Sequence, residues 1–346
     1  MHKALDRVYG LDLLRGLCSL LVVFYHLMIW TGHREMYSWG LHGVYIFFAL
    51  SGASLTLAYK PRFDSGFPLG SFLMLRAARL GPLFALASTI MFAHKWITDD
   101  GRIFQAISAG LLSTSLLFGF GNPGTTSLVL GGWSIGVEVV FYLIFPAVLV
   151  FAYSRRSYWV LAIVFLVQQA FVELTLSGTS DVKVVWESYT QPLAFMAYFF
   201  CGCLIGRYVM SGKSIGPGIS RLALLCVMGA LVCLSGPSSA ATVTGLRGVE
   251  LFVLSVSASF FAAFIEPRSA VFVKVCEVAG NMSYGLYLLH PIVFLVIKRV
   301  APGLALPYVC LGTLIPAVLI ALTLEKYFER PVRGLFRRYI FTPAPA

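Results

Sequence analysis

The sequence predicts an all-α integral membrane protein, a polytopic bundle of about ten transmembrane helices with one further, partly inserted segment. Three observations lead to this fold class: 58% of the 346 residues are apolar, only 12% are charged, and the mean hydropathy is +0.84. An average soluble domain carries about twice that charged fraction. A globule so poor in charge could not cover its surface with polar groups, whereas a lipid-facing surface has no such need.

Eleven apolar segments follow one another along the chain, each near the ~20 residues that a spanning helix needs. They cover roughly residues 11–31, 40–59, 72–93, 104–120, 133–153, 158–176, 192–210, 220–236, 247–265, 282–299 and 304–324. The first is expected to be a retained helix, because no small-residue cleavage site follows it. The segment 104–120 is the shortest, and Gly110 and several hydroxyl side chains interrupt it.

Basic residues set the predicted orientation, since positively charged loops stay on the cytoplasmic side of a membrane. Lys3 and Arg7 precede the first segment, and an arginine-rich stretch follows the last. Two cytoplasmic termini require an even number of crossings. We therefore expect ten crossings, with 104–120 re-entrant or partly inserted. Residues 1–346 would form one membrane domain that ends in a short basic cytoplasmic tail, 330–346.

The remaining composition excludes several other classes of protein. The net charge of +11 lies in short clusters between apolar runs, without the basic stripe and exposed aromatics of a nucleic-acid-binding surface. The seven cysteines lie mostly inside apolar runs and are expected to be small buried hydrophobes. Their spacing is not that of a zinc site, so no metal is expected.

Ionisable side chains inside membrane helices are costly and therefore candidates for function. In the first helix, Arg15 and His26 are eleven residues apart, a rise of about 16 Å on one helix face. That shared face suggests a lined path through the membrane, although a packing histidine is the plainer reading. Asp12 is expected to pair with Arg15 across three residues. Arg76 and Arg79 also share a face, and they suit either phosphates or lipid headgroups.

Two later stretches carry further candidates. Trp133-Ser134-Ile-Gly-Val-Glu138-Val-Val-Phe-Tyr142 places a carboxylate near the outer end of its helix, where it could meet His26 as a general-base pair. A structural hydrogen bond between helices is the alternative. Tyr287 and His290 share one face before Pro291, and a proline-kinked packing helix is the favoured reading there.

Six stretches, in one order along nearly the whole chain, resemble the membrane acyltransferase-3 family. They are Leu11-Asp-Leu-Leu-Arg15-Gly with Tyr25-His26, Gly43-Val-Tyr-Ile-Phe-Phe-Ala-Leu-Ser51-Gly52, Arg76-Ala-Ala-Arg79-Leu-Gly-Pro82, the Trp133–Tyr142 stretch, Ser283-Tyr-Gly-Leu-Tyr287-Leu-Leu-His290-Pro291 and Glu329-Arg-Pro331. Tyr45 departs from the acidic residue of many relatives, so no role is expected of that position. The chain looks like the stand-alone form, without a C-terminal hydrolase-like domain.

The resemblance implies transfer of an acyl group, usually acetyl, from cytoplasmic acetyl-CoA or another acyl-CoA to a hydroxyl of an extracytoplasmic or lipid-linked glycan. It places the protein in the bacterial inner membrane. His26 matches the family's essential histidine, Arg15 its first-helix arginine, Arg76 and Arg79 its arginine pair, and Glu138 its glutamate.

The mechanism expected from this resemblance binds the donor at the cytoplasmic face and transfers the acyl group deeper in the membrane. Arg76, Arg79 and Arg15 would hold the CoA, and His26 would take the proton of a sugar hydroxyl while Glu138 orients the ring. An acyl-histidine intermediate remains open. Candidate supporting residues are Asp12, Trp133, Ser134, Tyr142, Tyr287 and His290, of which Ser134, Tyr142 and Tyr287 could stabilise the oxyanion.

Two other functions compete with this expectation. A glycan or glycolipid transporter or flippase also uses intramembrane Arg, His and Glu, but it predicts two similar halves, and no internal repeat is visible. A structural or sensory membrane protein would leave the costly polar sites unexplained. Appearance of labelled acetyl on glycan would separate the three.

Overall fold

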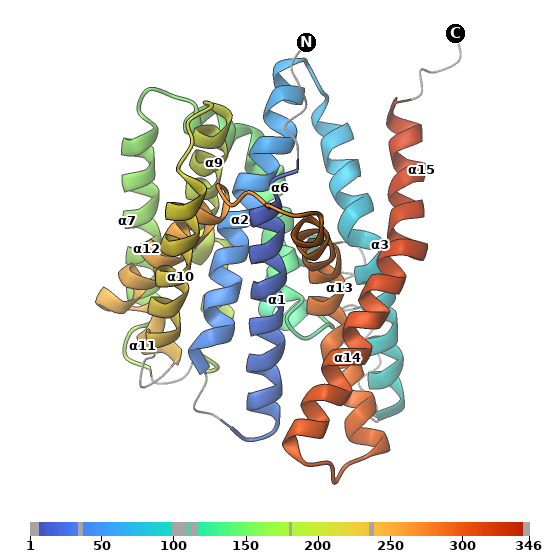
Figure 1. Cartoon of the computed structure of the whole chain (residues 1–346). Helices are drawn as coiled ribbons and strands as arrows, with labels where there is room; N and C mark the ends of the chain where they lie inside the picture. The colour runs from blue at the N-terminus through green and yellow to red at the C-terminus, as the bar shows by residue number, and fades with distance from the viewer. Residues whose placement is uncertain are drawn as a thin grey trace.

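The structure is a computed structural model that describes residues 7–33, 37–98, 110, 116–179, 182–234 and 239–341. Every regular element in this part is helical, in agreement with the predicted all-α class. The long helices of the bundle (Figure 1) are α1 (Tyr9–Trp30), α2 (Tyr37–Asp64), α3 (Leu69–Thr98), α6 (Trp133–Ala152), α7 (Ser157–Leu176), α9 (Met196–Met210), α10 (Pro217–Cys233), α12 (Gly245–Ala262), α13 (Ala270–Val300) and α14 (Leu306–Leu324).

Nine helical stretches within the described residues are long and apolar enough to cross a bilayer, and α10, with 17 residues, is a shorter apolar helix. The described chain enters α1 and leaves α15 at the same end of the bundle (Figure 1), which requires an even number of crossings. Counting α10 as a crossing satisfies this requirement. The predicted re-entrant segment 104–120 lies mostly outside the described residues, and its last part is the 3-10 turn η2 (Leu117–Phe120).

Short elements complete the chain: α5 (Pro123–Thr126), α8 (Trp186–Tyr189), η3 (Pro192–Phe195) and α11 (Ser239–Val243). After α14 the chain continues through the π-helical turn η4 (Glu325–Glu329) into α15 (Arg330–Phe341). The predicted basic tail is therefore helical as far as Phe341. It packs against α3, and Figure 1 shows it rising to the end that carries both termini.

Glycines bring α1 unusually close to α13. A Cβ on Gly16 would lie 2.6 Å from the Cβ of Ala279, and one on Gly280 would lie 2.7 Å from the carboxylate carbon of Asp12. Small residues permit such close contacts between membrane helices. Further along both helices, His26 of α1 meets His290 of α13, so α1 and α13 run parallel, and polar groups at equal depth can meet.

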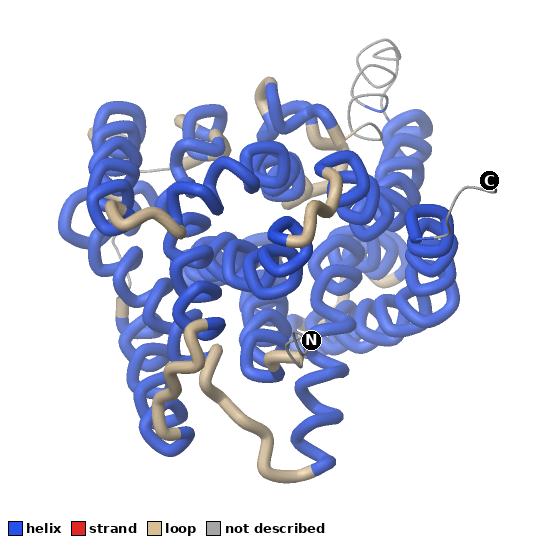
Figure 2. Tube along the Cα trace, turned by 90° about the horizontal axis from the view of Figure 1, so that it is seen from above, coloured by secondary structure: helices blue, strands red, loops and turns tan. Residues whose placement is uncertain are grey.

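A second close contact fixes α2. A Cβ on Gly52 would lie 2.1 Å from the carbonyl oxygen of Phe199 in α9, and one on Gly202 would lie 2.1 Å from that of Ala49. This packing positions the side of α2 that faces the interior. Figure 2, seen from the end that carries the termini, shows the helices grouped in one bundle with loops between their ends.

The helix α13 begins at Ala270, twelve residues before the start of the apolar segment predicted at 282. The extra turns carry Lys274, Glu277 and Asn281, which line a polar hollow rather than face lipid. A search of the sequence for apolar segments therefore misses this part of the helix.

Candidate active site

A large polar hollow, here called the inner vestibule, opens at the end of the bundle that carries both termini. Its walls come from α1, α2, α3, α13, η4 and α15. Nine cationic side chains face four carboxylates there: Arg7, Arg15, Arg62, Arg76, Arg79, Lys274, Arg330, Arg333 and Arg337 against Asp12, Glu277, Glu325 and Glu329. This excess of positive charge favours an anionic ligand, and guanidinium groups match the geometry of phosphate oxygens.

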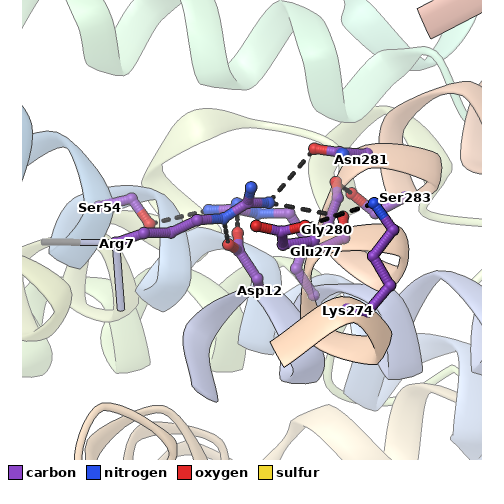
Figure 3. Close-up of polar contacts among 9 residues, drawn as sticks. Arg7, Asp12, Ser54, Lys274, Glu277, Gly280, Asn281 and Ser283 are labelled. Atoms are coloured by element: carbon purple, nitrogen blue, oxygen red, sulfur yellow. Dashed lines mark hydrogen bonds and ion pairs between the residues drawn. The ribbon is translucent and has the colours of Figure 1, made fainter. Parts of the chain in front are cut away.

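The carboxylate of Asp12 links two arginines of the vestibule. It forms an ion pair with Arg7, and a second one with Arg15 at 3.3 Å. The Asp12–Arg15 pair is the one expected from their spacing. Arg7 also donates to Asn281 of α13 at 3.2 Å, and Figure 3 shows Arg7 reaching from the start of α1 toward both partners. The start of α1 is thereby held against α13.

A second group of ion pairs joins η4 to α15. Glu325 accepts hydrogen bonds from Arg330 at 2.7 Å and from Arg333 at 3.0 Å, and Arg333 also donates to Glu329 at 3.3 Å. Both carboxylates are buried. These ion pairs neutralise much of the positive charge in the first turn of α15.

Arg76 and Arg79 of α3 differ from these paired arginines. No carboxylate of the described residues lies within ion-pair distance of either guanidinium group. The Arg76 guanidinium lies over the rings of Tyr59 and Tyr142, at 5.3 Å and 5.6 Å from their centroids, and its buried Nε has no hydrogen-bond partner in the described residues. Two cations without a carboxylate at 4 Å are well suited to bind a polyanion.

A second hollow, here called the buried cavity, continues from the vestibule into the bundle. The two share Arg15, Ser54, Arg76, Arg79 and Tyr284 as lining residues. The cavity has a volume of about 110 Å³ and extends to Ser134 and Tyr287. A path therefore leads from the basic vestibule toward the middle of the bundle.

Glu138 lines this cavity but does not contact His26, which corrects the predicted pair. Its carboxylate accepts a hydrogen bond from Ser51 Oγ of α2 at 2.6 Å. Ser54, one turn further along α2, accepts a hydrogen bond from Arg15 at 2.8 Å. Glu138 thus lies near the level of Arg15, whereas His26 lies ~16 Å further along α1. Glu138 therefore lies nearer the vestibule than expected for a helix that begins at the outer membrane surface.

His26 instead pairs with His290 of α13. The Nδ1 atom of His26 lies 2.8 Å from the Nε2 atom of His290, and the ring planes differ by only 15°. His290 is fully buried, and its Nδ1 lies 3.1 Å from the carbonyl oxygen of Leu286. Trp30 stacks on the His26 ring at 5.0 Å. The parallel packing of α1 and α13 brings these two histidines to the same depth.

A layer of polar contacts separates the buried cavity from this histidine pair. The Tyr287 hydroxyl donates to the carbonyl oxygen of Gly131 at 2.8 Å and lies 2.9 Å from Ser134 Oγ. Tyr287 lines the cavity, and its ring centroid is 6.4 Å from that of His290, while His26 lines neither hollow. Gly131 precedes α6 and has a φ of +77°, a conformation that favours glycine.

The structure separates the other predicted supporting residues by location. Tyr142 and Ser134 line the buried cavity. Trp133 does not, because its ring packs edge-on against Trp186 and Tyr189. The sequence analysis missed Ser51 and Ser54 as site residues, although two hydroxyls at i,i+3 in an apolar helix were a usable signal.

Comparison with known proteins bears on what such a site can do. The model of a family described as "Acyltransferase domain" matches residues 8–325, nearly the whole chain, and leaves out α15 and all of η4 after Glu325. The chain belongs to the membrane acyltransferase-3 family. This acyltransferase matches no solved structure.

Curated relatives of the acyltransferase are distant in sequence. It is 24% identical over 328 residues to the exopolysaccharide production protein ExoZ of Rhizobium meliloti (strain 1021), covering 91% of this chain and 96% of that protein. It is 23% identical over 382 residues to the O-acetyltransferase OatA of Staphylococcus aureus (strain NCTC 8325 / PS 47). That match covers 99% of this chain but only 61% of OatA.

Proposed function

We propose that this acyltransferase moves an acetyl or other acyl group from cytoplasmic acyl-CoA to a hydroxyl of an extracytoplasmic or lipid-linked glycan. The observation that carries the proposal is the continuity of the basic vestibule with a cavity that leads between α2, α6 and α13 toward the His26–His290 pair. A glycan acceptor is supported by the names of ExoZ and OatA, which refer to exopolysaccharide production and O-acetyl transfer.

The vestibule is assigned to the cytoplasmic face of a bacterial inner membrane, as the positive-inside rule requires for the end that carries Arg7 and Arg337. Arg76 and Arg79 bind phosphates of the CoA there, since no carboxylate in the described part of the chain competes for them at ion-pair distance. Arg15 helps to hold the donor where the vestibule meets the cavity. The Arg15–His26 rise of about 16 Å is comparable with an extended pantetheine arm.

Acyl transfer also requires the cavity to reach His26. We assign to Tyr287 the closing of the cavity, because its hydroxyl is held by Gly131 and Ser134 between the cavity and the histidines. Rotation of the Tyr287 ring would connect the two. The thioester could then reach His26 while the nucleotide stays in the vestibule.

In the chemical step, His26 takes up one proton and later releases it. Neutral His26 takes the proton of the acceptor hydroxyl as its oxygen attacks the thioester carbon. The C–S bond then breaks, the ester forms, and the imidazolium returns the proton to the departing CoA thiolate. Transfer through an acyl-histidine would use the same ring nitrogen and needs the same donor site.

The test is acyl transfer by the purified protein in lipid vesicles supplied with labelled acetyl-CoA and a glycan extract. We expect label in the glycan with wild-type protein and none above background with His26→Ala. His94→Ala is the matched control, since His94 is an exposed histidine at the far end of α3. Glycan movement without ester formation would instead identify a flippase.

A further inference from the structure

The contact between His26 and His290 has the geometry of a directional hydrogen bond. The ring centroids are 5.1 Å apart, whereas the two nitrogens are 2.8 Å apart. The difference is roughly one ring diameter, so the rings meet edge to edge and nearly in one plane. One of the two nitrogens must donate and the other accept, and the partners of His290 decide which.

We propose that His290 is a positioning residue that fixes the tautomer of His26, with the proton on Nδ1 and the lone pair on Nε2. This inference rests on the proposed function, because it explains how His26 can accept a proton from the substrate. It differs from the expected mechanism, in which a carboxylate would orient the ring.

The direction of the hydrogen bond starts at the backbone of α13. His290 Nδ1 faces the carbonyl oxygen of Leu286 at 3.1 Å. Carbonyl oxygens only accept, and His290 Nδ1 must therefore carry a proton.

The remaining protons follow from this one. A neutral imidazole has a single N–H, so His290 Nε2 has a lone pair and accepts from His26. His26 Nδ1 is then the donor, and His26 Nε2 is unprotonated. A neutral His290 is consistent with complete burial and with the absence of a carboxylate hydrogen-bonded to it in the described part of the chain.

Within the mechanism, this order gives His26 the state that proton transfer needs. When Nε2 takes the hydroxyl proton, the imidazolium keeps its Nδ1–H bond to His290. Without an acceptor at this place, either ring nitrogen of His26 could carry the proton, and the fraction with a free Nε2 would fall. The loss cannot exceed what the base itself contributes, ~10²–10⁴-fold.

Three variants test the role of His290 by kinetics. We expect His290→Phe to lower kcat for acyl transfer by about ten- to 100-fold while KM for the acyl donor stays within twofold. His290→Gln keeps an acceptor near the position of Nε2 and should recover most of the loss. His94→Gln is the histidine control and should match wild type. A kcat for His290→Phe equal to that of wild type would overturn the proposal.

A spectroscopic measurement does not depend on activity. In protein labelled with ¹⁵N-histidine, protonated and unprotonated ring nitrogens give well-separated signals, and His26→Gln identifies those of His26. We expect a protonated Nδ1 and an unprotonated Nε2 in His26, and a mixture of tautomers in His290→Phe. A doubly protonated His290, or Nε2–H on His26, would refute the inference. An inactive wild-type protein with the expected spectrum would refute only the proposed function.

Discussion

Replacing Arg79 by alanine removes a vestibule arginine of α3 that has no carboxylate at ion-pair distance in the described residues. A hydrogen bond to a charged group contributes about 1.5–3 kcal/mol, which corresponds to roughly a ten- to 150-fold change in Kd. We therefore expect acetyl-CoA to bind Arg79→Ala about ten- to 150-fold more weakly. Arg79 is a better test than Arg76, because truncation of Arg76 also removes its packing on Tyr59 and Tyr142.

Calorimetric titration of acetyl-CoA into the protein in lipid nanodiscs measures this change. Arg221→Ala is the matched control, since Arg221 bonds to the carbonyl oxygen of Glu266 and does not line the vestibule. The dependence of Kd on salt should also weaken in Arg79→Ala, because one phosphate contact is lost. A Kd within twofold of wild type in Arg79→Ala would refute the assignment of the donor site.

Three further substitutions test other parts of the site. Tyr287→Phe removes the hydrogen bonds to Gly131 and Ser134, each of which contributes about 0.5–1.5 kcal/mol. Without acceptor, hydrolysis of acetyl-CoA to free CoA should therefore rise several-fold, and an unchanged rate would argue against a closing role of Tyr287. Gly16→Val forces α1 away from α13 and should cost about 1–3 kcal/mol in stability together with most activity, whereas Gly229→Val, which meets open space, should change neither. Glu138→Gln should lower kcat less than about tenfold, below the ~10²–10⁴-fold range of general acid–base effects; a loss equal to that of His26→Ala would restore Glu138 as the partner of the base.

The bundle itself could be predicted from the sequence because lipid imposes simple rules on spanning segments. Apolar runs near 20 residues located the long helices, and the basic termini required an even number of crossings. The same rules failed at the start of α13, where Lys274 and Glu277 face the vestibule instead of lipid. Polar lining residues lower the hydropathy of a helix that is nevertheless part of the bundle.

The candidate residues could also be selected from the sequence, but their pairing could not. The spacing of Asp12 and Arg15 fixes their contact within one helix, and the structure contains it. The partner of His26 depends on depth, which the sequence of α6 does not reveal. Gly131 is level with Tyr287, one turn of α13 before His290, and α6 runs from there toward the vestibule, so Glu138 lies nearer the vestibule than the histidines do. Only the packing of α1 against α13 brings His26 and His290 together.

In the proposed mechanism, one donor molecule extends from the arginines of α3 to the histidine of α1. A cryo-EM structure of the protein with a non-hydrolysable thioether analogue of acetyl-CoA tests it directly. We expect the phosphates beside Arg76 and Arg79, the pantetheine arm in the buried cavity, and the acyl end next to His26 with the Tyr287 ring displaced. An analogue whose acyl end lies outside the bundle, or is still separated from His26 by packed side chains, would contradict the account.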